Sequence, residues 1–248
     1  MRKVIFLLAL LVPLVISAKT YLVAVGVSEY PQKERCLRLP ANDAATIRYV
    51  YSKNSNAETV LITNSNATQK AVLIAMQKAF VQAKANDIIV FFFSGHGSPG
   101  NFCLYDSNVP YAKIRAVMAK SKAKNKMIFA DACYSGRMRQ GRKKQTNNND
   151  QSLKNSNVML FLSSRGNEKS IERLDMKNGF FTSCLQKGLR GGADTNRDKT
   201  ITAKELFTYV STGVKKLSDD AQHPVMWESS ATICLLWYGS IRLSKYEW

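Results

Sequence analysis

The stretch Met127-Ile128-Phe129-Ala130-Asp131-Ala132-Cys133-Tyr134-Ser135-Gly136 is an apolar run that stops abruptly at an acid, a small residue and a cysteine, and then at a glycine. In parallel α/β folds, a buried strand of this kind carries the side chains at its end to the edge of the sheet where ligands bind. The stretch therefore predicts an α/β fold with a functional cysteine at that edge.

A second apolar run, residues 88–93, ends in the same way in Ser94-Gly95-His96-Gly97. If the two runs are neighbouring parallel strands, the thiol of Cys133 and the imidazole of His96 emerge side by side. An imidazole is the usual means of turning a cysteine into a nucleophilic thiolate. The backbone N–H groups of Gly97 and Cys133 can then form an oxyanion hole. The alternatives are a structural histidine and a cysteine that only fills the core.

Strand and helix patterns alternate along the first half of the chain, which predicts a mostly parallel central sheet with helices on both faces. We expect strands at 20–27, 58–63, 88–93 and from 126, and helices after Asn42 or Asp43, after Thr68 and over 109–120. A polar basic segment follows at 137–157, and then a strand at 158–163, helices at 180–189 and 205–217, and a strand at 232–237. We interpret 19–248 as one domain, divided by this mobile basic linker into the parts 19–136 and 158–248.

The N-terminus has the pattern of a secretory signal peptide over residues 1–18. Arg2 and Lys3 precede an apolar run over 4–16, and the small residues Ser17 and Ala18 follow it. The alternative is a membrane anchor, but a span needs about 20 apolar residues and this run is shorter. We predict cleavage near Ala18, an exported protein (periplasmic or secreted), and no stable membrane anchor.

The chain is strongly basic, with a formal net charge of +18. Such a surface could meet nucleic acid, anionic lipid or acidic glycans. Its lysines and arginines are spread along the sequence without the interleaved aromatic residues that a stacking platform for bases needs. This favours a solvated basic surface and no nucleic-acid partner, and we expect a monomer.

The five cysteines do not suggest a metal centre. None is spaced as C-x-x-C, and only two histidines are present, which gives a Cys/His zinc site little support. Cys184 and Cys234 lie in apolar segments, where we expect them to be buried. An odd count leaves at least one thiol outside any disulfide in an oxidising compartment.

Ser94–Gly97 together with Asp131–Gly136 resembles the catalytic signature of caspase-like peptidases of clan CD, closest to the metacaspases and bacterial caspase homologues. The resemblance extends to the first strand and to residues 39–43, 162–172 and 178–182, which is nearly the whole mature chain. It implies the caspase-hemoglobinase fold and a cysteine endopeptidase in which His96 is the general base and acid and Cys133 is the nucleophile. Asp131 stands where animal caspases have glutamine, and His96 is only 37 residues before Cys133 instead of about 50. Both departures point to the metacaspase side.

Asp131 predicts the charge of the substrate. It lies two residues before Cys133, on the same face of the strand, and a carboxylate there favours a cationic P1 side chain. The resemblance implies that Asp43 is the second carboxylate of this pocket, and the alternative for Asp43 is a helix cap. We therefore expect cleavage after Arg or Lys, including self-processing in the loop 137–154. A rival hypothesis is a non-catalytic caspase-like module that binds basic peptides or a protein partner.

The segment 194–205 has some features of a calcium loop. Its candidate ligands are Asp194, Asn196, Asp198 and Glu205, but Lys199 stands where an EF-hand needs glycine. The alternative is a polar turn in which Thr202 and Glu205 form the capping box of the next helix. Calcium binding stays open, and with it a third hypothesis of a calcium-dependent adhesion protein. The Cys/His chemistry requires no cofactor.

Overall fold

The computed structural model describes residues 18–132, 158–164, 175–227 and 234–237. Its centre is a six-stranded sheet in the order β10-β8-β7-β3-β1-β2, in which only the pairing of β10 with β8 is antiparallel. The predicted fold class, a mostly parallel α/β sheet, is confirmed. The strands are β1 (Thr20–Gly26), β2 (Ala57–Thr63), β3 (Ile88–Gly95), β7 (Asn125–Ala132), β8 (Val158–Leu162) and β10 (Val225–Trp227).

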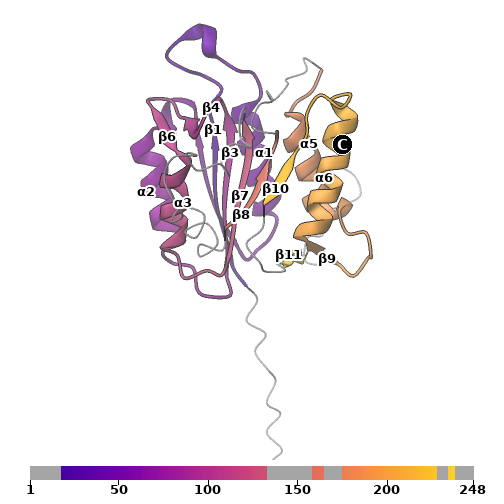
Figure 1. The fold of residues 1–248 in the computed structure, drawn as a ribbon. Helices are drawn as coiled ribbons and strands as arrows, with labels where there is room; N and C mark the ends of the chain where they lie inside the picture. The colour runs from indigo at the N-terminus through magenta and orange to yellow at the C-terminus, as the bar shows by residue number, and fades with distance from the viewer. Residues whose placement is uncertain (1–17, 133–157, 165–174, 228–233, 238–248) are drawn as a thin grey trace, which may run out of the picture.

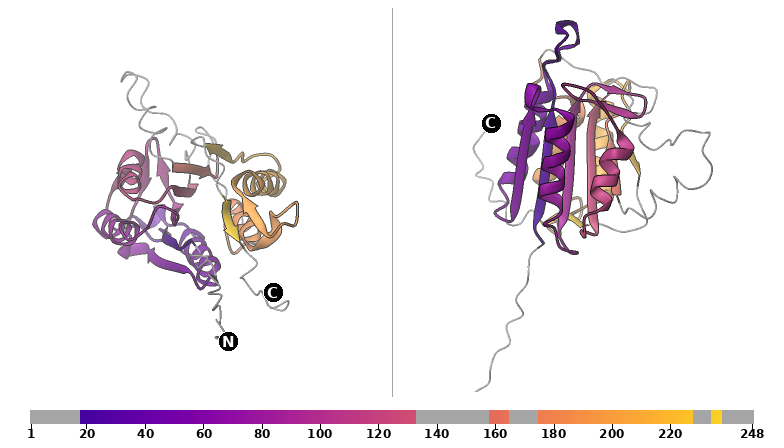
Figure 2. Two further views of the ribbon diagram at one scale, coloured as in Figure 1. Left: turned by 90° about the horizontal axis from the view of Figure 1, so that it is seen from below. Right: turned by 90° about the vertical axis from the view of Figure 1, so that its left-hand side faces the viewer.

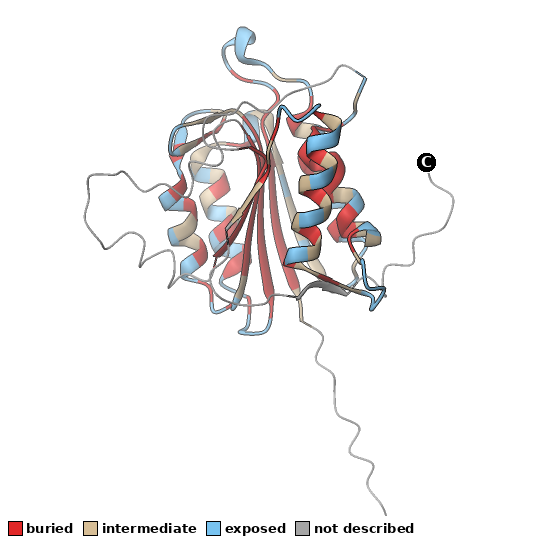
Figure 3. Ribbon diagram, turned by 45° about the vertical axis from the view of Figure 1, so that its right-hand side comes forward, coloured by how far each residue is buried: buried red, intermediate tan, exposed pale blue. Residues whose placement is uncertain are grey.

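Helices cover both faces of this sheet, as Figures 1 and 2 show. One face carries α2 (Gln69–Phe80) and α3 (Tyr111–Ala119), and the other carries α1 (Pro40–Ser52), α5 (Phe180–Lys187) and α6 (Ala203–Leu217). Side chains alternate along each strand, so that Phe91 joins the first core and Phe92 the second. The strands β1, β3, β7 and β8 are buried along nearly all of their length, the edge strand β2 is only partly buried, and each helix turns its exposed side outward (Figure 3). The central strands therefore read as continuous apolar runs in the sequence.

Short elements complete the architecture. A three-stranded sheet of β4 (Gly97–Ser98), β5 (Asn101–Cys103) and β6 (Asn108–Pro110) follows β3 directly. A two-stranded sheet joins β9 (Thr200–Thr202) to β11 (Cys234–Trp237), which lies within the strand expected at 232–237. The remaining turns are η1 (Lys33–Arg35), η2 (Asn64–Asn66) and the π-helical η4 (Gly188–Gly192). Strands of two or three residues are too short for periodicity to reveal, so the sequence does not predict β4, β5, β6, β9 or β10.

The start of α1 corrects one prediction. The helix begins at Pro40, with Leu39 as its N-cap residue and no side-chain cap, so neither Asn42 nor Asp43 caps it. Proline has no N–H to leave unsatisfied and its φ already suits a helix, so it can open the helix without a polar cap. In contrast, the predicted cap of α2 is confirmed, because the Thr68 hydroxyl accepts a hydrogen bond from Ala71 N–H at 3.2 Å.

Several predictions fall on residues outside the described part of the chain. These are the signal peptide up to residue 17, the linker at 137–157 and Cys133 itself. Cys184 is buried, as predicted. Within the described ranges, no helix has both the length and the hydrophobicity needed to cross a bilayer.

We predict that Gly26→Ala destabilises the fold. A Cβ at Gly26, the last residue of β1, would lie 2.9 Å from the Ala41 Cα and still closer to the Pro40 carbonyl. These are backbone atoms of α1, so the helix would have to shift away from the sheet. The free energy of unfolding in urea should fall by about 1–3 kcal/mol. Unchanged stability would contradict the close approach of α1 to this strand end.

Candidate active site

The candidate site lies where β1, β3 and β7 end at one edge of the sheet. The parallel register of β3 and β7 places Ser94 opposite Asp131 and Gly95 opposite Ala132. His96 follows β3 directly, and Cys133 is the next residue after Ala132 in the sequence but lies outside the described residues. The two strands expected to carry the histidine and the cysteine are therefore adjacent and in register.

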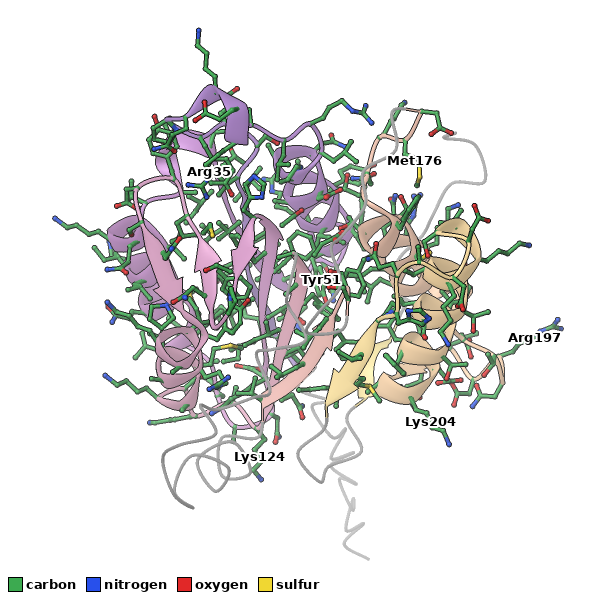
Figure 4. All side chains as sticks on the ribbon, turned by 45° about the horizontal axis from the view of Figure 1, so that its top comes forward. Arg35, Tyr51, Lys124, Met176, Arg197 and Lys204 are labelled. Atoms are coloured by element: carbon green, nitrogen blue, oxygen red, sulfur yellow. The ribbon has the colours of Figure 1, made fainter. Side chains whose placement is uncertain are left out.

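His96 is held by two hydrogen bonds. Its Nε2 lies 2.8 Å from the Arg35 carbonyl oxygen, and its backbone N–H donates to the Tyr30 hydroxyl at 3.0 Å. A carbonyl oxygen can only accept, so Nε2 carries a hydrogen, and in the neutral ring Nδ1 has the lone pair. Nδ1 is thus the atom that can take a proton from a thiol. Figure 4 shows Arg35 near the end of the fold where the strands finish.

Tyr30 is a part of this site that the sequence did not reveal. Its hydroxyl accepts from His96 N–H and donates to the Cys103 carbonyl at 3.0 Å, while Cys103 N–H donates to the His96 carbonyl at 2.9 Å. In a regular antiparallel pair, His96 N–H would donate directly to the Cys103 carbonyl. Here the Tyr30 hydroxyl lies between these two groups and bonds to both. Burial raises the pKa of Tyr30, so its hydroxyl remains a neutral donor. Its ring also lies 5.1 Å from the His96 ring.

The glycines on either side of His96 have different geometric roles. Gly95 has a φ of 153°, and a Cβ there would come within 3.1 Å of the Tyr30 hydroxyl. Gly97 lies opposite Phe102 in the next register position after the bonded pair of His96 and Cys103. Bonded and non-bonded pairs alternate in an antiparallel ladder, so the Gly97 N–H points away from β5. This direction is compatible with the predicted oxyanion donor.

The predicted pocket residues Asp43 and Asp131 meet around Gly179, at the start of α5. A Cβ on Gly179 would lie 2.6 Å from Asp131 Oδ2 and 3.4 Å from Asp43 Oδ2. The exposed fraction is 1% for Asp43 and 7% for Asp131, so both carboxyl groups are out of bulk water. Asp43 is therefore not a helix cap. It is the fourth residue of α1 and is buried beside Asp131 of β7.

Asp43 has neutral hydrogen-bond donors on both oxygens. Ser94 Oγ donates to Oδ2 at 2.8 Å, and Asn178 Nδ2 and Gly179 N–H donate to Oδ1 at 2.9 and 3.0 Å. Burial, and next the negative charge of Asp131, raise the pKa of Asp43 to about 8, although these hydrogen bonds oppose the shift. A positive charge at this point would attract both carboxylates, and would so offset their mutual repulsion and part of the cost of burying them in the ionised form.

Asp131 is fixed by α5. Its Oδ2 accepts from the Thr182 N–H at 3.2 Å and from the Thr182 hydroxyl at 2.9 Å. The segment 178–182 thus supplies donors to both carboxyl groups. The sequence resemblance covered this segment without assigning it a role, because nothing in a local pattern shows that α5 lies against the end of β7.

The candidate calcium residues are engaged within their own segment. Both Glu205 oxygens accept hydrogen bonds, from Thr195 and from Thr202, and with Thr202 they complete a capping box on α6. These bonds hold the pKa of Glu205 down at about 2. Asp194 Oδ2 accepts from Lys199 N–H at 3.0 Å, and Asp198 accepts from Thr200 N–H and Asn196 Nδ2. In the described ranges no group of three His, Cys, Asp or Glu side chains is arranged to hold a metal ion. The capping box of the helix-cap alternative is therefore present, and calcium binding stays a prediction.

Comparison with known proteins is consistent with this geometry. The family model of the caspase domain matches residues 19–235. The chain belongs to the caspase domain family. Caspase-1 from Spodoptera frugiperda superimposes with a TM-score of 0.64 at 15% identity, covering 87% of this chain and 88% of that one. A Geobacter sulfurreducens protein superimposes with a TM-score of 0.59 at 16% identity, covering 84% of this chain and 92% of that one. At such identities the likeness supports the fold alone, and no curated protein sequence gave a significant match.

We predict that the stability of this caspase-like domain falls less with rising pH when Asp43 is replaced by Asn (Asp43→Asn). The raised pKa of Asp43 means that the folded state retains its proton from the usual value of 3.8 up to about 8. The contribution of Asp43 to the stability of the wild type is therefore lost as pH rises through that interval. The melting temperature of Asp43→Asn minus that of the wild type should increase between about pH 5 and about pH 8. Asp219→Asn, an exposed acid, is the control, and equal trends for both variants would contradict the prediction.

Proposed function

We propose that this caspase-like protein is an exported cysteine endopeptidase that hydrolyses peptide bonds after Arg or Lys. Membership of the caspase domain family supports the peptidase class. The observation that carries the substrate preference is the pair of buried carboxyl groups, Asp43 and Asp131, beside the strand end that bears His96. Export rests on the sequence pattern of residues 2–18, and a monomer is the expected state.

The proposed chemistry uses His96 and Cys133. The Cys133 thiol gives its proton to His96 Nδ1, and the sulfur bonds to the carbonyl carbon of the scissile peptide. The C=O electron pair moves to the oxygen, where the N–H groups of Gly97 and Cys133 stabilise the charge. When the C–N bond breaks, Nδ1 returns its proton to the leaving amine. A water molecule then gives a proton to His96 Nδ1 and bonds to the thioester carbon, the C–S bond breaks, and the Cys133 sulfur takes the proton back as the acid product leaves. The Arg35 carbonyl, bonded to Nε2, stabilises the imidazolium formed in between.

The substrate preference follows from charge. A guanidinium or ammonium group brought to Asp131 and Asp43 would let both acids ionise, because a positive charge removes the repulsion between them. Ser94 and Asp131, at the ends of β3 and β7, lie two residues before His96 and Cys133 respectively in the sequence, and the pocket acids are thus close to the proposed dyad along the chain. An aspartate side chain at P1 would instead bring a further negative charge to these acids.

The rival hypothesis, a non-catalytic module that binds basic peptides, uses the same carboxyl groups. The arrangement of His96 favours catalysis, because Nε2 is bonded to a carbonyl and Nδ1 keeps its lone pair for a thiol. A calcium-dependent adhesion protein has less support, since Glu205 is engaged in the capping box. Peptide hydrolysis separates these classes directly.

We predict that the protein cleaves fluorogenic peptides ending in Arg or Lys and not those ending in Asp. Cys133→Ala and His96→Ala should each lower kcat by about 10⁴ or more, with unchanged circular dichroism. Asp131→Asn should lower kcat/KM about 30-fold or more, since it removes one side of a desolvated charge pair. The same assay in EDTA and in millimolar calcium measures any calcium dependence. Near-normal turnover in either dyad variant, or a preference for Asp, would refute the proposal.

We also predict self-cleavage in the segment 137–154. Exposed polar segments are preferred sites of proteolysis, and this one contains Arg137, Arg139, Arg142, Lys143, Lys144 and Lys154. The fragments should stay together because β7 and β8, which flank the segment, are paired in one sheet. Purified wild type should give two bands on a denaturing gel and one peak in gel filtration, while Cys133→Ala remains intact. Equal cleavage of that variant would assign the processing to another protease.

A further inference from the structure

Lysines that are far apart in the sequence come together at the end of the fold where the strands begin. Ile88 N–H donates to the Lys19 carbonyl at 2.8 Å, Lys84 N–H donates to Asp87 Oδ2 at 2.8 Å, and Lys124 N–H donates to the Ala85 carbonyl at 3.0 Å. These bonds connect the start of β1 with the two loops that enter β3 and β7. We call this region the basic end, defined by its exposed lysines Lys78, Lys84, Lys120, Lys122 and Lys124.

The exposed charged side chains of residues 78–87 and 113–126 are all cationic. Asp87 is 8% exposed, and its carboxylate accepts from the backbone N–H groups of Lys19 and Lys84. Glu58, at the start of β2, pairs with the Lys19 ammonium. In contrast, the exposed charges between 187 and 220 include both signs: Lys187, Arg197, Asp198, Lys199, Lys204, Lys215, Lys216, Asp219 and Asp220. The gathering of lysines is therefore a local feature and not only a result of the net charge.

The loop that carries three of these lysines is anchored from beneath. The buried Lys126 donates from Nζ to the Ser121 and Ala119 carbonyls at 3.0 and 3.3 Å. Ser121 Oγ donates to the Phe80 carbonyl at 2.7 Å, which ties this loop to the end of α2. The side chains of Lys120, Lys122 and Lys124 thus project from a fixed backbone. Figure 4 shows Lys124 extending outward from this end of the molecule.

An apolar side chain lies among these charges. Val81, the residue after α2, is 74% exposed, between Lys78 and Lys84 in the sequence. Among the described residues of 78–87 and 113–126, the one aromatic side chain, Phe80, is buried. Lysines around an exposed aliphatic residue suit the headgroup region of a bilayer, whereas single-stranded nucleic acid needs exposed aromatic rings for stacking.

The chain also enters the fold at this end. Ala18 and Lys19 precede β1, and the apolar run 4–16 ends only two residues before them in the sequence. We propose that the basic end binds the surface of a membrane rich in anionic lipid. The strands then point away from the bilayer, and β3, with eight residues, sets the candidate active site roughly 26 Å from it.

The experiment is sedimentation of the purified protein with vesicles. Phosphatidylcholine vesicles containing about one-third phosphatidylglycerol are compared with pure phosphatidylcholine, at low and at high salt. The variant Lys120→Glu/Lys122→Glu/Lys124→Glu reverses the loop lysines. Its control, Lys204→Glu/Lys215→Glu/Lys216→Glu, makes the same change of net charge with exposed residues of α6. A second loop variant with glutamines replaces the charges more gently, and circular dichroism checks the fold of all three.

Wild type should bind the anionic vesicles only, and high salt should release it. The affinity of the glutamate loop variant for these vesicles should fall by at least about a hundredfold. The glutamine variant should also bind more weakly than wild type. The affinity of the α6 variant should stay within a few-fold of that of wild type. Equal loss in the loop and α6 variants would overturn the proposal, as would equal binding to neutral vesicles. Release from vesicles by an equimolar single-stranded oligonucleotide would assign the basic end to nucleic acid instead. The assay requires no peptidase activity, so its outcome is independent of the proposed chemistry.

Discussion

The parallel pairing of β3 with β7 is the constraint on which the candidate site depends. Register in a sheet buried on both faces is strongly fixed, because a slip by one residue would exchange every side chain between the two cores. The observed register sets Ser94 beside Asp131 and Gly95 beside Ala132. It therefore determines which polar groups reach the edge together. The β1–β3 pairing adds a second fixed neighbour, and Gly26 at the end of β1 admits the start of α1, which carries Asp43.

Burying two carboxyl groups side by side is unfavourable unless their oxygens are satisfied and their charge is partly neutralised. Here the donors come from two separate elements: Ser94 from β3, and Asn178, Gly179 and Thr182 from the start of α5. The same groups link both halves of the chain, since α1 and β7 precede the segment 133–157 and α5 follows it. Gly179 is needed because a Cβ would collide with Asp131. Packing and charge at the pocket thus depend on the same residues, and these two buried acids are the basis of the proposed preference for a cation.

The sequence predicted the parts of the molecule that are written in local patterns. Continuous apolar runs gave the central strands, and the ends of two such runs singled out His96 and Asp131. Tyr30 could not be predicted in this way, because its role depends on a loop folding back between His96 and Cys103. The same holds for Asp43, which a helix-cap pattern describes equally well until the position of α5 is known. For the segment 194–205, both the calcium and the capping-box patterns fit the sequence, and the hydrogen bonds of Glu205 support the second.

The separation of charge along the strands bears on how a basic protein could accept basic substrates. A surface of high positive charge repels Arg and Lys side chains over a distance set by the Debye length, about 8 Å at physiological salt. The basic end lies at the opposite end of the strands from His96, roughly 26 Å away by the length of β3. Its repulsion is therefore almost fully screened at the catalytic edge. Among the described residues, the exposed charges near that edge are mixed, with Glu29 and Glu34 among Lys33, Arg35 and Arg38. Under the proposed function, a cationic side chain that approaches past these described residues meets charges of both signs before it reaches the buried acids of the pocket.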